Sequence, residues 1–174
     1  MTVAGTSHRL TLVLGGARSG KSRHAEHLVE RHAPPWIYIA TAQALDDEMS
    51  GRIALHRDRR SDRWITQEAP LELPESIRGA PPGRPVLVDC LTLWLTNVCL
   101  AGNSVEAAIG ELVETCRATA GPLVLVSNEV GLGIVPDHDL GRRFRDHAGV
   151  LHQRLAGEAD RVLFMVAGLP MVLK

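Results

Sequence analysis

The sequence has no excess of charge of either sign and no long apolar run. Its 174 residues contain 19 Lys and Arg against 20 Asp and Glu, so the formal net charge is −1. A balance this even lacks the basic surface expected of a nucleic-acid-binding protein. No stretch approaches the roughly 18 apolar residues of a membrane-spanning helix, and residues 1–9 contain no hydrophobic signal core. We therefore expect neither a nucleic-acid partner nor a membrane span.

Cysteine is scarce as well. The three cysteines, Cys90, Cys99 and Cys116, are an odd number and form no C-x-x-C pair. They fit reduced, mostly buried thiols in a cytoplasmic protein better than a disulfide framework. With 45% hydrophobic and 22% charged residues, the composition is that of a globular chain. We expect one domain over residues 10–174, large enough to fold without disulfides, behind a loose tail over residues 1–9.

Short apolar runs alternate with segments of helical pattern. Five runs without polar alternation predict parallel strands buried on both faces: Leu10–Leu14, Trp36–Ala40, Val86–Val88, Leu123–Val126 and Val162–Val166. Trp64–Gln67 is a candidate for a sixth strand. Helices are expected over Lys21–His32, Asp46–Arg60, Ser104–Thr119 and Asp139–Ala156. This alternation predicts an α/β fold of the P-loop NTPase type, an open, mostly parallel sheet with helices on both faces.

Two of the expected helices carry further signals. Ser104 stands where a side chain caps a helix N-terminus. The last helix has a single apolar stripe, which we expect to pack on the sheet, formed by Leu140, Phe144, Ala148, Leu151 and Leu155. The pattern suggests no role for the histidines in or beside that helix, among them His152.

The strongest motif is GGARSGKS at residues 15–22, a full match to G-x-x-x-x-G-K-[ST]. A strand precedes it and a helix follows, as a phosphate-binding loop requires. Its glycines let backbone N–H groups turn toward phosphate oxygens at the positive end of a helix. A ligand-free glycine-rich turn is the alternative. We expect a nucleoside triphosphate to be bound by Gly15, Gly16, Ala17, Arg18, Ser19, Gly20, Lys21 and Ser22.

Within that loop, Lys21 is expected to reach the β- and γ-phosphates, and the Ser22 hydroxyl to ligate Mg²⁺. A second magnesium ligand is expected at Asp89, because the apolar run before it ends in this carboxylate, as a Walker B strand does. Many strands end in aspartate, so a simple helix-capping role for Asp89 is the alternative.

Residues 52–63 contain five arginines and His56. His56 follows Ile53 by three residues, on the apolar side of the expected helix, where most histidines are simply packed. Asp58 and Asp62 offset part of the charge, so the segment also fits a solvated helix face. A neutral imidazole flanked by arginines can, however, attack phosphorus while the cations hold the phosphates. The pattern alone leaves these interpretations open.

The segment SNEVGLGIVP at residues 127–136 directly follows an expected strand. Ligands of open α/β sheets collect beyond the carboxyl ends of the strands. Glu129 would leave its strand there, on the same side as the P-loop and Asp89. The glycines of the segment fit either backbone close to a ligand or a tight turn.

As a linked set, these motifs resemble one family. They are, in order, GGARSGKSRHAE, YIATAQ, DDEM, RIALHRD, the VDC segment around Asp89 and NEVGLGIVP, and the resemblance runs from about Leu10 to the last residue. The chain looks like the bifunctional adenosylcobinamide kinase and adenosylcobinamide-phosphate guanylyltransferase of cobalamin biosynthesis.

The resemblance implies two reactions. The first phosphorylates adenosylcobinamide with ATP or GTP. The second transfers GMP from GTP to adenosylcobinamide phosphate through a guanylylated histidine and releases pyrophosphate. His56 matches that histidine, so the resemblance favours chemistry at His56 over a packing role. His56 and Lys21 are the implied catalytic residues.

The resemblance also implies Mg²⁺, a corrinoid substrate and a homotrimer with its nucleotide site at a subunit boundary. Further nucleotide contacts are implied for Thr41, Ala42, Gln43, Arg57, Asp58, Arg59, Arg60, Glu68 and Asp89. Three positions depart from the pattern without removing a required group: Leu55 stands where relatives often have histidine, Arg59 where some have glycine, and Asp89 where some have glutamate.

Two other functions stay open at this point. A plain P-loop small-molecule kinase would use the same loop, with His56 only structural. A nucleotide-binding regulatory protein would need loops that sense the γ-phosphate. The chain lacks the NKxD-type guanine-reading motif of switch GTPases, which counts against the regulatory protein.

Overall fold

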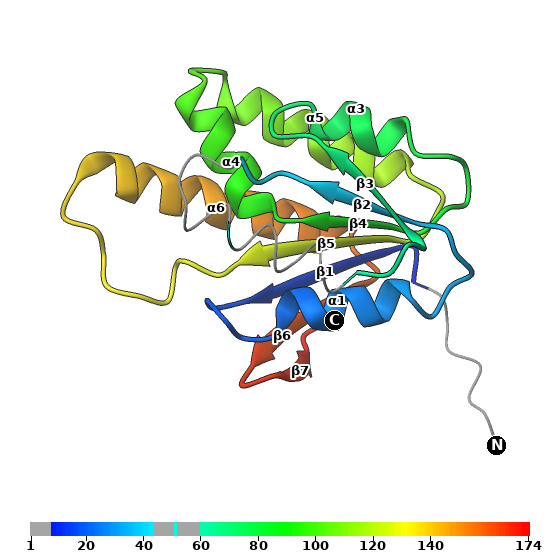
Figure 1. The fold of residues 1–174 in the computed structure, drawn as a ribbon. Coiled ribbons are helices and arrows are strands. Elements are labelled where there is room, and N and C mark those ends of the chain that lie inside the picture. The colour runs from blue at the N-terminus through cyan, green and yellow to red at the C-terminus, as the bar shows by residue number, and fades with distance from the viewer. Residues whose placement is uncertain (1–7, 44–50, 52–59) are drawn as a thin grey trace.

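The computed structural model describes residues 8–43, 51 and 60–174. Its centre is a seven-stranded sheet in the order β3-β2-β4-β5-β1-β6-β7 (Figure 1). Every neighbouring pair is parallel except β6 and β7. The strands are β1 Leu10–Gly15, β2 Trp36–Ala40, β3 Trp64–Glu68, β4 Val86–Asp89, β5 Leu123–Asn128, β6 Arg161–Val166 and β7 Leu169–Val172.

The predicted strands are confirmed, including the candidate sixth at β3, and the sheet is open and mostly parallel. The sequence pattern missed β7. This strand has four residues, one of them Pro170, and a proline within a short run argues against a strand. Pro170 is tolerated because β7 lies at the edge of the sheet, where one side of the strand has no ladder partner.

The described helices are α1 Lys21–Val29, α3 Leu73–Arg78, α4 Leu91–Leu100, α5 Val105–Ala118 and α6 Asp139–Glu158. The sequence pattern missed α3, which has six residues, and α4, which is apolar nearly all round and therefore shows no helical period. The helix expected over residues 46–60 lies outside the described residues, apart from positions 51 and 60. No helix in the described ranges is long and apolar enough to cross a membrane.

Helices cover both faces of the sheet, as predicted (Figure 1). On one face, Leu12 and Leu125 of the central strands pack with Trp94 of α4 and with buried side chains of α3, α5 and α6. On the other face, Val13 packs with Val29 of α1. Because side chains alternate along a strand, each central strand contributes to both cores.

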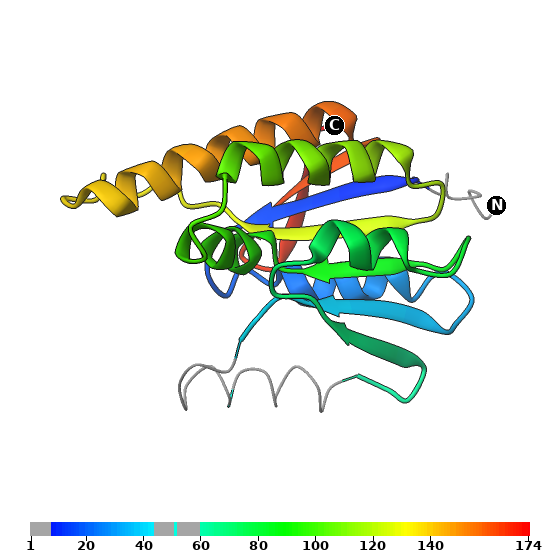
Figure 2. The same ribbon diagram turned by 90° about the horizontal axis from the view of Figure 1, so that it is seen from above.

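Helix α6 covers the sheet with only part of its length. Ala148 and Leu155 are buried and Phe144 is partly buried, but Leu140 is 62% exposed. Figure 2 shows the reason, since the first turns of α6 extend past the carboxyl ends of the strands. The prediction that the whole stripe packs on the sheet is therefore wrong at Leu140.

Among the described helices, α5 and α6 each have a side chain that caps the N-terminus. The Ser104 hydroxyl accepts a hydrogen bond from Ala107 N at 3.3 Å, as expected. His138 Nδ1 accepts from Gly141 N at 3.0 Å and caps α6. A cap satisfies one of the N–H groups that the first turn of a helix leaves without an intrahelical partner.

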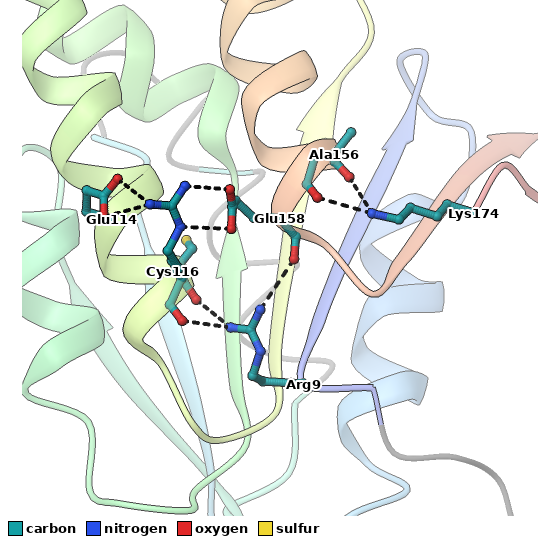
Figure 3. A network of polar contacts seen from close by, with 8 residues as sticks. Arg9, Glu114, Cys116, Ala156, Glu158 and Lys174 are labelled. Atoms are coloured by element: carbon teal, nitrogen blue, oxygen red, sulfur yellow. Dashed lines mark hydrogen bonds and ion pairs between the residues drawn. The ribbon is translucent and has the colours of Figure 1, made fainter.

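Arg9, just before β1, and Lys174, after β7, donate hydrogen bonds to the carboxyl ends of the helices α5 and α6 (Figure 3). Arg9 Nη1 donates to the carbonyl oxygens of Cys116 at 2.7 Å and Thr119 at 3.1 Å, and its Nη2 donates to that of Glu158 at 3.3 Å. Lys174 Nζ likewise donates to carbonyl oxygens at the end of α6. These carbonyls have no intrahelical donor, and the negative end of a helix favours a cation. Arg9 is thus anchored, although it falls within the expected loose tail.

Replacing Arg9 by Ala should lower the free energy of unfolding by about 1–3 kcal/mol, because partly buried carbonyls lose their donors. Arg9→Lys, which keeps the charge but not the fork of donors, should fall between Arg9→Ala and the wild type. Urea denaturation measures both. Arg9 lies at the amino ends of the strands, so nucleotide affinity should not change. Wild-type stability in Arg9→Ala would contradict the proposed clamp.

The three cysteines are free, and they should differ in reactivity. Burial, with a smaller contribution from Asp89, raises the pKa of the Cys90 thiol to about 11, and burial raises that of Cys116 to about 12. At pH 8 both are therefore neutral thiols, which are poor nucleophiles. Iodoacetamide should label only the partly exposed Cys99 in the native protein and all three in urea, as counted by intact mass. Rapid native labelling of Cys90 would contradict this.

Candidate active site

The carboxyl ends of the parallel strands bring several of the predicted site residues to one edge of the sheet. Gly15, at the end of β1, lies beside Asn128 of β5, and Ala40 of β2 lies beside Asp89 of β4. Glu129 N donates to Gly15 O at 3.0 Å, so the segment after β5 begins next to the P-loop, as predicted. In open α/β sheets this edge is where ligands bind.

The P-loop links β1 to α1, which begins at Lys21. Ser19 N donates to Gly16 O at 3.3 Å, and Gly20 has a φ of 91°, which a glycine adopts without strain. No side chain caps the N-terminus of α1, and its first turn contains no acidic residue. The N–H groups there are therefore left for an anionic ligand such as a phosphate.

Lys21 is only 8% exposed, and its Nζ donates to Gly16 O at 2.9 Å across the loop. Burial lowers the pKa of Lys21, while the nearby Cys90 and Asp89 act in the opposite direction. An ammonium with so little water around it gains strongly from added negative charge. The arrangement suits a lysine that receives phosphate oxygens.

Asp89 is held by a neighbouring strand. The buried Tyr38 hydroxyl donates to Asp89 Oδ2 at 3.2 Å. The guanidinium carbon of Arg60 lies 3.5 Å from the centre of the Tyr38 ring, a cation–π contact. Burial and the Asp89 carboxylate raise the pKa of Tyr38, so its hydroxyl stays a donor.

Two buried polar atoms near this edge lack partners. Arg60 Nη1 and Ser19 Oγ make no hydrogen bond in the described part of the chain. Buried donors are normally satisfied, so an unpaired one at a binding edge points to a ligand that accepts hydrogen bonds. Phosphate oxygens are such acceptors.

Ser22 and Asp89 offer the donor set that Mg²⁺ prefers, a hydroxyl and a carboxylate oxygen. Mg²⁺ commonly takes only one or two protein ligands and completes its shell with water and substrate phosphates. Across the described ranges, no group of three or more His, Cys, Asp or Glu side chains could hold a metal alone. The residues therefore fit a magnesium ion that arrives with a nucleotide.

The remaining predicted contacts differ in their surroundings. Thr41 is fully buried: its hydroxyl donates to Cys90 O at 2.7 Å and accepts from Cys90 N at 2.9 Å, and its carbonyl accepts from Asn97 Nδ2. Its polar groups thus join β2 to β4, and its nucleotide contact stays a prediction. Glu68 ends β3 opposite Ala40, at the same edge.

Ala42 and the exposed Gln43 continue the chain beyond β2. Four predicted residues lie outside the described residues, namely His56, Arg57, Asp58 and Arg59. Their roles stay predictions, as do those of Ala42 and Gln43.

A buried polar network beneath this edge was not predicted. His152 Nε2 lies 2.7 Å from Ser127 Oγ, which lies 3.1 Å from Thr92 Oγ1, and Thr92 Oγ1 accepts from Asn128 N at 2.7 Å. The network joins α6, β5 and α4 below the end of β5. Burial lowers the pKa of His152, with the Glu129 carboxylate acting against it. The spacing of His152, four residues after the stripe residue Ala148, is the signal that could have revealed it.

Glu129 turns back toward its own loop. Its Oε1 accepts hydrogen bonds from Gly131 N and from Leu132 N, and its Oε2 lies 3.9 Å from His152 Nδ1. Of the two interpretations of this segment, the described contacts fit the tight turn. A direct part for Glu129 in chemistry stays a prediction.

Fold and site together define a P-loop nucleotide-binding α/β protein. Solved structures with the same fold include the P4 protein from bacteriophage phi6 in complex with ADP. Its TM-score is 0.51 at 16% identity, and the match covers 94% of this chain and 52% of that one. The flagellar accessory protein FlaH from Methanocaldococcus jannaschii also has a TM-score of 0.51, at 10% identity, and the match covers 95% of this chain and 78% of that one. At such identities the likeness concerns the fold alone.

The chain belongs to the cobinamide kinase / cobinamide phosphate guanyltransferase family, whose model matches residues 11–173. It is 53% identical over 167 residues to the bifunctional adenosylcobalamin biosynthesis protein CobP of Pseudomonas aeruginosa, covering 94% of this chain and 96% of the relative. It is 43% identical over 181 residues to the bifunctional adenosylcobalamin biosynthesis protein CobU of Salmonella typhimurium. That match covers 95% of this chain and 99% of the relative. The resemblance seen in the sequence is confirmed, and the chain is an enzyme of a kinase and guanylyltransferase family.

Tyr38→Phe should weaken GTP binding and raise the Mg²⁺ concentration that binding requires, each by about tenfold, because Asp89 loses the donor that orients it. Titration calorimetry at several Mg²⁺ concentrations measures both. The phenylalanine ring keeps the stacking with Arg60, whereas Tyr38→Leu removes it as well. Unchanged binding in Tyr38→Phe would show that Asp89 needs no such support.

Proposed function

We propose that this enzyme phosphorylates adenosylcobinamide with ATP or GTP and then transfers GMP from GTP to the new phosphate. The products are adenosylcobinamide-GDP and pyrophosphate. The observation that carries the proposal is the P-loop at Gly15–Ser22, whose buried Lys21 lies near Asp89 at the ligand-binding edge, in a chain of the cobinamide kinase / guanyltransferase family.

In the kinase step, the P-loop N–H groups and Lys21 hold the β- and γ-phosphates. The aminopropanol hydroxyl of adenosylcobinamide loses its proton as its oxygen attacks the γ-phosphorus. The bond from that phosphorus to the bridging oxygen breaks, so that the nucleoside diphosphate leaves. Such transfers depend mainly on positioning and charge stabilisation. Ser22 and Asp89 would hold Mg²⁺, which when bound neutralises charge on the phosphates.

In the guanylyl step, an unprotonated ring nitrogen of His56 attacks the α-phosphorus of GTP. The bond to the β-phosphate oxygen breaks, and pyrophosphate leaves. A phosphate oxygen of adenosylcobinamide phosphate then attacks the same phosphorus, the phosphorus–nitrogen bond breaks, and the imidazole is regenerated. Imidazole suits this role because it is a good nucleophile and, once protonated, a good leaving group.

The contact between Arg60 and Tyr38 supports the role that we propose for His56. Arg60 stacks on Tyr38, which donates to Asp89. His56 precedes Arg60 by four residues in the sequence. This short separation supports our proposal that His56 reacts with the bound nucleotide.

The arginines near His56 would neutralise the departing pyrophosphate, because a guanidinium matches phosphate geometry. Arg60 Nη1, buried without a partner in the described ranges, supports this. We assign further nucleotide contacts to Thr41, Ala42, Gln43, Arg57, Asp58, Arg59 and Glu68.

We further propose a cytoplasmic homotrimer whose nucleotide site lies at a subunit boundary. Exposed apolar side chains near the site edge support a subunit contact there: Leu132 is 81% exposed, Ile134 98% and Leu140 62%. Exposed apolar clusters of this kind commonly mark interaction surfaces. Light scattering that gives a monomer at assay concentrations would contradict the trimer.

The histidine intermediate is tested by intact-protein mass after incubation with GTP and Mg²⁺. The wild type should gain the mass of GMP in an acid-labile adduct, and His56→Ala should gain none while it keeps measurable kinase activity. His27→Ala, at an exposed position on α1, should behave as the wild type. Lys21→Ala should impair both reactions, because both use the P-loop.

The other outcomes separate the alternatives. GTP binding and kinase activity without an adduct in any variant would favour a plain P-loop kinase. GTP binding without turnover in the presence of adenosylcobinamide would favour a regulatory protein. Equal loss of both activities in His56→Ala would contradict the role given to His56.

A further inference from the structure

The turn between β6 and β7 lies directly against the P-loop. Gly168 N donates to Ser19 O at 3.0 Å. A Cβ atom placed on Gly20 would lie 3.2 Å from Gly168 Cα, and one placed on Gly15 would lie 2.9 Å from Met165 O in β6. Both glycine ends of the loop are therefore packed against the same hairpin, which Figure 1 shows beside β1 and α1.

The turn is built to offer this hydrogen bond. Val166 pairs with Leu169 across the hairpin, so Ala167 and Gly168 form a two-residue turn. Their φ angles are 52° and 81°, both in the left-handed region that such turns require. The N–H groups at the centre of a two-residue turn take no part in the ladder. The N–H group of Gly168 is therefore available to donate to Ser19 O.

The bond fixes the orientation of one P-loop peptide. The Ser19–Gly20 peptide is planar and trans, so its C=O and N–H groups point in opposite directions. Because Ser19 O is held toward Gly168, the Gly20 N–H points away from that residue. Backbone N–H groups of a phosphate-binding loop are the groups that meet phosphate oxygens, so the orientation of this one matters for binding.

We propose that the β6–β7 turn is a positioning element for nucleotide phosphates, in which Gly168 holds the Gly20 N–H toward the phosphate. The proposal rests on the nucleotide-binding role of the P-loop proposed above. Gly168 touches no substrate and acts only through Ser19 and Gly20. Its effect should therefore fall on the phosphate part of the ligand and not on the nucleoside.

Gly168→Ala tests the turn. No atom lies within 4 Å of a Cβ placed there, so alanine causes no clash, but a φ of 81° strains it and should displace the turn. Gly83→Ala and Gly102→Ala are matched controls, with φ angles of 77° and 72°, no neighbour within 4 Å and no contact with the P-loop. The free energy of unfolding, measured in urea, should fall by a similar amount in all three variants.

The readout is affinity by titration calorimetry, for Mg²⁺–GTP and for inorganic tripolyphosphate. Gly168→Ala should raise the Kd of both ligands by about tenfold, because a charge-assisted hydrogen bond is misaligned. The two controls should stay within about twofold of the wild type. Ala167→Asn, which suits the left-handed turn, should retain wild-type affinity.

Equal affinities in Gly168→Ala and the controls would overturn the positioning role. A loss of affinity for GTP without a similar loss of affinity for tripolyphosphate would also overturn it. A wild type that binds neither GTP nor ATP would instead overturn the proposed function itself.

Hydrogen exchange on the wild-type protein keeps the test open if Gly168→Ala does not fold. Added tripolyphosphate should slow exchange of the Gly168 amide more than that of Ala167, because only Gly168 bonds to the P-loop. An unchanged Gly168 amide would overturn the proposal.

Discussion

The register of β1 between β5 and β6 is the constraint on which the rest of the site depends. It sets Gly15 between Asn128 and Met165 at the point where the ladder ends. The loop that follows can only rise from this edge, where Glu129 N also bonds to Gly15 O. A one-residue slip would exchange the faces of β1, so that Leu12 would enter the core in which Val13 packs, and the packing of both cores would be disrupted. The two hydrophobic cores therefore fix the phosphate loop as firmly as its own sequence does.

Some of the polar and charged side chains around this edge of the sheet are largely shielded from water. Lys21 and Tyr38 are both largely buried, and each interacts with Asp89. In such surroundings each charged group is stabilised chiefly by its neighbours, so the gain from an incoming phosphate is larger than it would be at an open surface. Arg60 adds a second cation through its stacking on Tyr38. Strand β2 thus takes part in the site through Tyr38, which contacts both Asp89 and Arg60.

The sequence predicts the strands and the P-loop well because each has a local signal: an apolar run, or glycines at fixed spacing before a lysine. It fails where the signal is not local. Helix α4 is apolar on nearly every side, and β7 contains Pro170, so neither shows the expected period. The partnership of His152 with Ser127 joins positions that only the fold brings together. Thr41 matches a family motif, yet burial turns its hydroxyl toward Cys90, which no motif could reveal.

The position of β1 also has a consequence for how the protein is made. This strand is synthesised before its ladder partners β5 and β6, which follow it by more than a hundred residues. Until they emerge from the ribosome, β1 has neither neighbour, and the P-loop has no hairpin to rest on. Folding of this edge therefore depends on distant contacts and is completed only after β5 and β6 have been synthesised. A nascent chain cannot capture a nucleotide early, so ligand binding cannot guide the first stages of folding.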